Sequence, residues 1–179
     1  MKLFAGAVLV SCFVVSAAYT QNLRPPIPFF DYGACPFECC TYRRWSVKAD
    51  TVLFKQRSAK SGVAFRVKKG EHVTGLTGVV ITLKPGQAVA KNTSTTNTSA
   101  RNVRLRPGDT LYLLTYEGED VFKIWYRGKI FEANTYMNQK DIKFLDRPQA
   151  VWWVKVKNSR GQVGWTKQNQ NFGDIDACG

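Results

Sequence analysis

Two stretches of this chain match each other without a gap, and they restrict its fold more than any other feature. Residues 65–77 and 103–115 each read apolar, Arg, apolar, basic, then a glycine turn followed by an acid, then a second apolar segment. Gly70 and Gly108 fit a turn position that needs a positive φ. The acids that follow, which can accept backbone hydrogen bonds in that turn, are Glu71 and Asp109. A repeated β-hairpin of this kind predicts duplicated barrel units.

The rest of the chain also has a β pattern. From Trp45 onward, short segments rich in branched and aromatic residues alternate with turns that contain Gly or Pro. Only Asp141–Leu145 suggests one short turn of helix, because no segment keeps a helical period. The polar run Asn92–Ser99 predicts a solvated loop between two units. The expected fold class is therefore all-β.

Aromatic residues are frequent in the second half. In the strand expected at 151–157, alternation places one set of side chains in the core and the other towards solvent. The core set is Trp152, Val154 and Val156, and the solvent set is Trp153, Lys155 and Lys157. We expect Trp45 and Trp165 in the core as well. One of Trp125 and Tyr126 must point outward, since the two are adjacent in a strand.

Three motifs resemble the bacterial SH3 domain pattern. They are Val67–Thr74, a Trp-x-x-Val strand, and the closing segment Gly161–Trp165. With Asp31–Glu38 and Asp176–Gly179 included, the chain resembles secreted bacterial SH3-like proteins. The resemblance implies one or two small SH3-like barrels and binding to peptidoglycan or another cell-wall component. The family often accompanies a hydrolase domain, and this chain carries none.

The sequence predicts a linear order of parts. These are a signal peptide (1–18), an extended arm with Pro and Cys (19–40), a first SH3-like unit (41–91), a polar loop (92–102) and a second unit (103–179). Long connections at 84–102 and 132–150 leave the number of barrels open. A nested arrangement, in which 151–168 closes the first barrel around an inserted second unit, is the alternative.

The first residues predict export. Lys2 precedes a short apolar run, and small residues at 16–18 suit signal cleavage after Ala18. The run is shorter than the ~20 residues that a bilayer span needs, so we expect no transmembrane span. The protein would then be secreted or periplasmic. Alternatively, Leu9–Cys12 resembles a lipobox, which would make a lipoprotein anchored through Cys12.

Four cysteines remain after the expected cleavage, which is an even number in an oxidising compartment: Cys35, Cys39, Cys40 and Cys178. A bond between neighbours 39 and 40 is disfavoured because it closes a strained ring. Either remaining pairing ties the 35–40 segment to Cys178. The segment lacks Cys-x-x-Cys spacing and a nearby His, so we expect no metal.

The net charge of the chain and its lack of catalytic motifs limit the classes of function to consider. The net charge is +13 and the isoelectric point is near 9.7, which favours anionic partners. Such partners are cell-wall polymers, lipid headgroups and nucleic acid, and export makes nucleic acid the least natural of the three. The sequence has no nucleophile elbow, zinc-protease helix or phosphate loop. Its one His, His72, sits in a strand, and Glu117, Glu119 and Asp120 indicate an exposed acidic turn. We expect neither enzymatic activity nor a cofactor.

The sequence therefore predicts a binding module for an anionic cell-envelope component. The candidate ligand-binding residues lie on the aromatic and basic strand face and on turns expected beside it: Trp153, Lys155, Lys157, Arg127, Lys129 and Arg160. An aromatic ring beside cations suits an anionic glycan. The alternative is a structural or assembly protein whose barrel binds another exported protein. The oligomeric state is left open.

Overall fold

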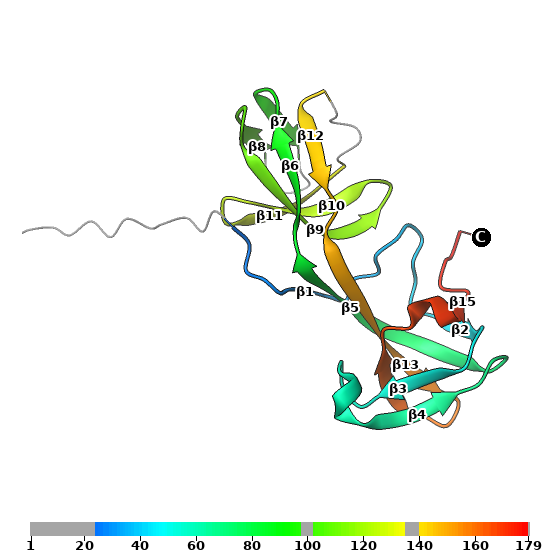
Figure 1. Ribbon diagram of the computed structural model, residues 1–179. Coiled ribbons are helices and arrows are strands. Elements are labelled where there is room, and N and C mark those ends of the chain that lie inside the picture. Colours follow the sequence, from blue (N-terminus) through cyan, green and yellow to red (C-terminus); the bar gives the residue numbers. More distant parts are fainter. Residues whose placement is uncertain (1–23, 98–101, 135–139, 179) are drawn as a thin grey trace, which may run out of the picture.

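The computed structural model describes residues 24–97, 102–134 and 140–178. In these residues the protein is all-β, as predicted, and its two larger sheets curl into two units joined at a waist (Figure 1). The helical content of the described chain is limited to two 3-10 turns, η1 (Ala59–Ser61) and η2 (Asn169–Asn171). None of its helices is long and apolar enough to cross a membrane. The predicted signal peptide and Cys12 lie outside the described residues.

The first unit, here called the outer unit, contains strands from both halves of the chain. Its sheet has the order β15-β2-β5-β13-β14-β3-β4, with β1 added beside β5. The strands are β1 (Phe29–Tyr32), β2 (Arg44–Val47), β3 (Thr51–Phe54), β4 (Val63–Val67), β5 (His72–Lys84), β13 (Gln149–Asn158), β14 (Val163–Thr166) and β15 (Phe172–Gly173). Strand β1 falls within the predicted arm, so four residues of the arm belong to the sheet.

The second unit, here called the inserted unit, is continuous in sequence. Its main sheet has the order β11-β10-β9-β6-β12, and a separate hairpin pairs β7 with β8. The strands are β6 (Gly86–Ala90), β7 (Ser94–Asn97), β8 (Asn102–Leu105), β9 (Thr110–Gly118), β10 (Val121–Tyr126), β11 (Lys129–Asn134) and β12 (Ile142–Asp146). Read as β12-β6-β9-β10-β11, this order corresponds strand for strand to β15-β2-β5-β13-β14 of the outer unit.

Strand pairing corrects the predicted linear division at 91 and 103. Strand β13 pairs with β5 from Gln149 opposite Lys84 to Asn158 opposite Val73, and β14 meets β3. The chain therefore leaves the outer unit at Lys84 and re-enters it at Gln149, as in the nested alternative. In the inserted unit, the equivalent connection between β9 and β10 is a tight turn at Glu119 and Asp120. The linear division was wrong because strand pairing across an insertion leaves no local signal.

The two copies of the repeat do form equivalent turns. Gly70 has φ of 89° and Gly108 has φ of 86°. The backbone N–H of Lys68 donates to Glu71 at 3.0 Å, and that of Arg106 donates to Asp109 at 2.7 Å. The N–H of Gly70 donates to the carbonyl of Val47 at the end of β2, and that of Gly108 donates to the carbonyl of Ala90 at the end of β6. The predicted turn chemistry is confirmed at both sites.

Each unit has its own apolar core. Trp45 and Trp152 are buried in the outer unit, as predicted, and Trp45 packs against Phe172 with ring centroids 5.7 Å apart. The core of the inserted unit includes Phe122, Ile124 and Tyr126. Because Tyr126 is buried and Trp125 is only partly so, the predicted alternation at that pair is also confirmed.

Gly75 is required by the position of Trp45. A Cβ atom at Gly75 would lie 2.6–2.8 Å from three atoms of the fully buried Trp45 indole. We expect Gly75→Ala to lower the free energy of unfolding by about 1–3 kcal/mol, because the ring must shift within a packed core. Urea denaturation checks this. In the Trp45→Phe background, Gly75→Ala should cost less; an equal cost in both backgrounds would contradict the clash.

Two predicted local structures were wrong. Within Asn92–Ser99, expected to be a loop, Ser94–Asn97 forms β7, which pairs with β8. Asp141–Leu145, expected to contain a turn of helix, overlaps β12, which pairs with β6. In both cases pairing with a neighbouring strand overrides a weak local preference, as is common for β structure.

Two disulfides hold the ends of the described chain. Cys35 is bonded to Cys40, and Cys39 to Cys178. The prediction that the 35–40 segment is tied to Cys178 is therefore confirmed. Backbone hydrogen bonds support this link, because the N–H of Ala177 donates to Cys39 and that of Thr41 donates to Ile175.

A charged cluster joins the two units. The ammonium of Lys123 on β10 lies 3.0 Å from Asp31 on β1 and 3.1 Å from Glu117 on β9. Asp31 is buried, and nearby the hydroxyl of Thr82 on β5 donates to the carbonyl of Leu114 at 3.1 Å. The units are thus joined by polar contacts at the waist as well as by two chain connections, from β5 to β6 and from β12 to β13.

Candidate functional site

The face predicted to bind ligand exists, but it is covered. On β13, Trp152, Val154 and Val156 point into the core, so Trp153, Lys155 and Lys157 share the opposite face. Trp153 nevertheless has only 8% of its surface exposed, whereas Lys157 is exposed. The prediction that Trp153 is a solvent-facing ligand contact is therefore wrong.

Strand β1 extends this face of the sheet. Tyr32 lies opposite Val79, which in turn lies opposite Trp153, so the three residues form one row across the sheet. Residues directly opposite each other in antiparallel strands share a face. Phe30 lies in the neighbouring row, opposite Ile81. The N-terminal arm thus adds two aromatic rings beside Trp153.

Arg57 lies above this face. It belongs to the loop between β3 and β4, and its guanidinium carbon is 5.3 Å from the ring centre of Tyr32, 5.4 Å from that of Trp165 and 5.8 Å from that of Phe30. Tyr32 lies on β1 in the row of Trp153, and Trp165 lies on β14 in the row of Lys155, so Arg57 lies over the strands between β1 and β14. Three ring faces therefore hold one cation by cation–π attraction.

One nitrogen of the Arg57 guanidinium lacks a hydrogen-bond partner among the described residues. The Nη1 atom of Arg57 is buried and makes no hydrogen bond within the described part of the chain. A buried donor without a partner costs free energy, and a group that accepts from it would recover that cost. The guanidinium is a planar donor, and its geometry matches an acceptor such as a carboxylate.

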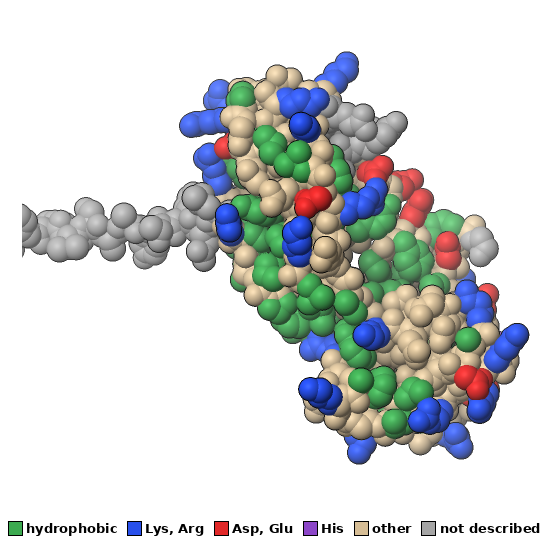
Figure 2. Space-filling view, viewed as in Figure 1, with side chains coloured by type: hydrophobic (Ala, Val, Ile, Leu, Met, Phe, Trp, Pro, Cys, Tyr) green, Lys and Arg blue, Asp and Glu red, His purple; other side chains and the backbone are tan. Residues whose placement is uncertain are grey.

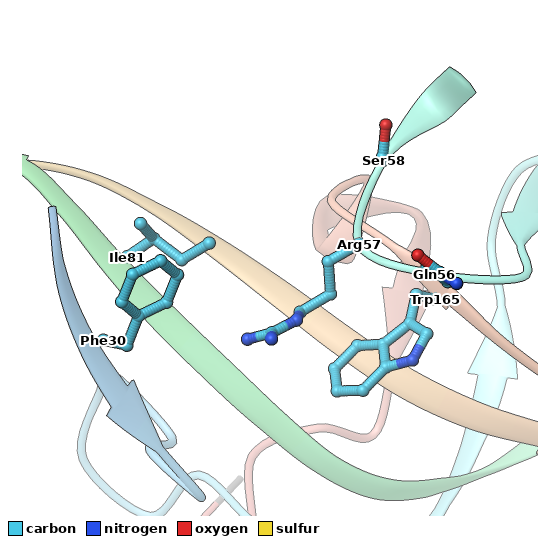
Figure 3. A pocket seen from close by; sticks show the side chains of 6 residues that line it. All are labelled: Phe30, Gln56, Arg57, Ser58, Ile81 and Trp165. Atoms are coloured by element: carbon cyan, nitrogen blue, oxygen red, sulfur yellow. The ribbon is translucent and has the colours of Figure 1, made fainter. Parts of the chain in front are cut away.

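A cavity of about 410 Å³ opens beside this arginine. Figure 3 shows the Arg57 side chain extending between Phe30 and Ile81 on one side and Trp165 on the other. The lining residues are Phe30, Gln56, Arg57, Ser58, Ile81 and Trp165. We call this the Arg57 cavity.

A second cation lies beside the cavity. Lys155 is directly opposite Trp165 in the β13–β14 pair, and its ammonium is 5.7 Å from the Trp165 ring centre. Trp165 is partly exposed and lines the cavity, so the prediction that it belongs to the core was wrong. It lies on the same face as Lys155, with its ring close to two cations.

The other predicted binding residues do not gather here. Arg160 lies in the turn between β13 and β14, at the end of the outer unit far from the waist. Arg127 and Lys129 belong to the β10–β11 hairpin of the inserted unit, where Arg127 pairs with Asp109 at 2.9 Å. Of the six predicted residues, Lys155 alone lies beside the cavity and remains accessible. The nested topology separates the turns that a linear arrangement would have placed together.

Glu117 and Tyr126, two titratable groups outside the cavity, have structural partners. Burial raises the pKa of Glu117, although the neighbouring Lys123 opposes the shift. Glu117 is thus ion-paired at the end of β9 and not part of an exposed turn; the turn itself contains Glu119 and Asp120. Burial and a hydrogen bond to Asp109 raise the pKa of Tyr126 to about 12.

The one cluster with metal-ligand atoms consists of Cys39, Asp176 and Cys178, within the described residues. Its two sulfurs are bonded to each other, so they offer no thiolate to a metal ion. His72 is exposed at the start of β5. The arrangement that combines free donors, apolar rings and space for a ligand is the Arg57 cavity.

Comparison with protein-family models, curated proteins and solved structures finds no match to this chain. The site is therefore argued from its own geometry. Sequence reasoning missed Arg57 and Phe30 because each lies in a segment without a motif: a polar loop and the N-terminal arm. The only signal for Phe30 is the alternation of Phe29–Tyr32, which suits a strand.

Proposed function

We propose that this protein is an exported, non-catalytic binding module for an anionic polymer of the cell envelope, and that the Arg57 cavity holds an acidic group of that polymer. The observation that carries the proposal is the buried, unpartnered Nη1 of Arg57 beside an open cavity lined by aromatic rings. An acidic sugar suits such a site, because its carboxylate can meet the arginine while its apolar faces meet Phe30 and Trp165.

Two further features support the proposal. The net charge of +13 attracts polyanions over long range, and Lys155 adds a cation next to the cavity. The corresponding strand order of the two units, with a β3–β4 hairpin after β2 and a β7–β8 hairpin after β6, also suits the predicted SH3-like barrels, nested one in the other. In the outer unit a 3-10 turn, η2, precedes the closing strand β15.

Arg57→Gln should weaken binding to purified, insoluble bacterial cell wall by about 30-fold, the loss expected when a central arginine contact of about 2 kcal/mol is removed. Arg57→Lys should recover only part of the affinity, because lysine keeps the charge and loses the planar fork. Co-sedimentation at several salt concentrations measures both effects. The part of binding due to exposed charges should weaken with salt, since these are screened beyond ~10 Å at 0.1 M.

Arg160→Gln is the matched control, because it removes one arginine charge from the exposed far end of the same unit. It should reduce binding only slightly and mainly at low salt. Equal losses for the two variants would mean that net charge, and not the Arg57 cavity, holds the polymer. Capture of one defined exported protein in place of wall material would favour the alternative role in assembly.

A further inference from the structure

A second cavity lies along the same pair of segments as the first. It has a volume of about 260 Å³ and is lined by Arg24, Pro25, Ile27, Lys84, Pro85, Gln87 and Tyr112. We call it the arm cavity. Two of its lining residues are cations, Arg24 and Lys84, and no acidic residue of the described chain lines either cavity. Both cavities therefore favour anionic groups.

The two cavities are close along the chain. Phe30 and Ile81 line the Arg57 cavity, while Ile27 and Lys84, three residues away on the same two segments, line the arm cavity. On β5, the three residues from Ile81 to Lys84 span about 10 Å. Phe30 and Ile81 are also direct partners in the β1–β5 pair, which continues towards the arm cavity as far as Phe29 opposite Thr82.

Exposed apolar side chains belong to the same two segments that line the cavities. Ile27 is 42% exposed, Phe30 is 40% exposed and Leu83 is 54% exposed. Figure 2 shows hydrophobic side chains gathered at the waist, where β1 and the end of β5 lie in Figure 1. An apolar strip with cations at both ends is complementary to a chain that has apolar faces and repeated negative charges.

Resting on the proposed function, we infer that the ligand is a linear polyanion that occupies both cavities at once and crosses the apolar strip between them. The Arg57 cavity holds one acidic group, and Arg24 with Lys84 holds another farther along the same polymer. Once one group is bound, the other binds at a high effective concentration, so affinity depends on polymer length. Lys84 also lies 3.5 Å from Asp146, a contact between two exposed side chains that a polymer anion can replace at little cost.

The test measures affinity for oligogalacturonates of increasing length, which carry one carboxylate per sugar, by titration calorimetry. The affinity of the parent protein should rise by about 100-fold once the oligomer is long enough to reach both cavities. The methyl-esterified oligomers, which have the same sugars without the charges, should show no such step. A second probe series of linear polyphosphates distinguishes carboxylate from phosphate preference at the same cavities.

The decisive variant is Arg24→Gln with Lys84→Gln. It should abolish the length-dependent step, so that long oligomers bind no more tightly than the shortest ones. The matched control, Lys129→Gln with Lys143→Gln, removes two exposed lysine charges from strands of the inserted unit and should keep the step. Near-ultraviolet circular dichroism confirms that each variant is folded.

The outcomes are distinguishable. If the step persists in the Arg24 and Lys84 variant, or disappears equally in the control, the arm cavity does not hold the polymer and the inference is overturned. In that case short oligomers still bind in an Arg57-dependent way, and the proposed function stands. If no oligomer binds and Arg57→Gln changes nothing, the proposed function is overturned and the inference with it.

Discussion

Replacing both Cys39 and Cys178 with serine should lower the free energy of unfolding by about 5 kcal/mol. The bond joins residues 139 positions apart, and closing so long a loop removes much of the entropy of the unfolded chain. Urea denaturation without reductant, followed by tryptophan fluorescence, measures the effect. Because β15 and the C-terminal segment are held by this bond, we also expect faster hydrogen exchange there.

The other disulfide is the matched control. Cys35 and Cys40 are only 5 positions apart, so replacing both with serine should cost about 2 kcal/mol in the same chain-entropy treatment. The two variants thus differ in loop length while removing the same chemistry. Equal losses of stability would show that loop closure is not the source of the stabilisation.

The second large effect is expected at the waist. Lys123→Met should lower the free energy of unfolding by about 3 kcal/mol, because it leaves the buried Asp31 and the partly buried Glu117 without their cation. Burial opposes the charge of Lys123, but hydrogen bonds and charge attraction from Asp31 and Glu117 outweigh it and raise the pKa of its ammonium. The cluster therefore favours the folded state while the carboxylates are ionised.

The stability that Lys123→Met loses should depend on pH. Burial raises the pKa of Glu117 above its ordinary value, and removing Lys123 removes the main opposing influence. A carboxyl whose pKa is raised on folding favours the folded state below its unfolded pKa and loses that contribution as the pH rises. The deficit of Lys123→Met should therefore shrink as the pH falls towards 4. A deficit independent of pH would indicate lost packing and not lost charge.

A double variant tests whether Asp31 and Lys123 are directly coupled. The double variant Asp31→Asn, Lys123→Met removes both charges. Its loss of unfolding free energy should therefore be smaller than the sum of the losses in the two single variants. Lys143→Met, which replaces an exposed lysine on β12, is the control and should change stability by less than about 0.5 kcal/mol. Additive losses at Asp31 and Lys123 would contradict a direct coupling between the units through this contact.

The candidate site shows which features of a β-strand the sequence can predict. Alternation correctly assigned Lys155 and Trp153 to the same face, since side chains of a strand alternate with a period of two. Alternation does not say what covers that face. Here β1 extends that face and Arg57 lies over it, and both come from segments distant in sequence. The proposed ligand site is therefore the Arg57 cavity and not Trp153.

Local features of this protein could be predicted from the sequence alone: the β class, the glycine turns at Gly70 and Gly108, the core positions of Trp45 and Trp152, and the tie between the 35–40 segment and Cys178. These depend on backbone conformation, side-chain period and covalent chemistry, which nearby residues specify. Two features are visible only in the folded chain: β13 returns to pair with β5, and part of the polar run forms β7. Strand pairing is a contact between distant segments, and its free energy depends on both partners and on the surface they bury together.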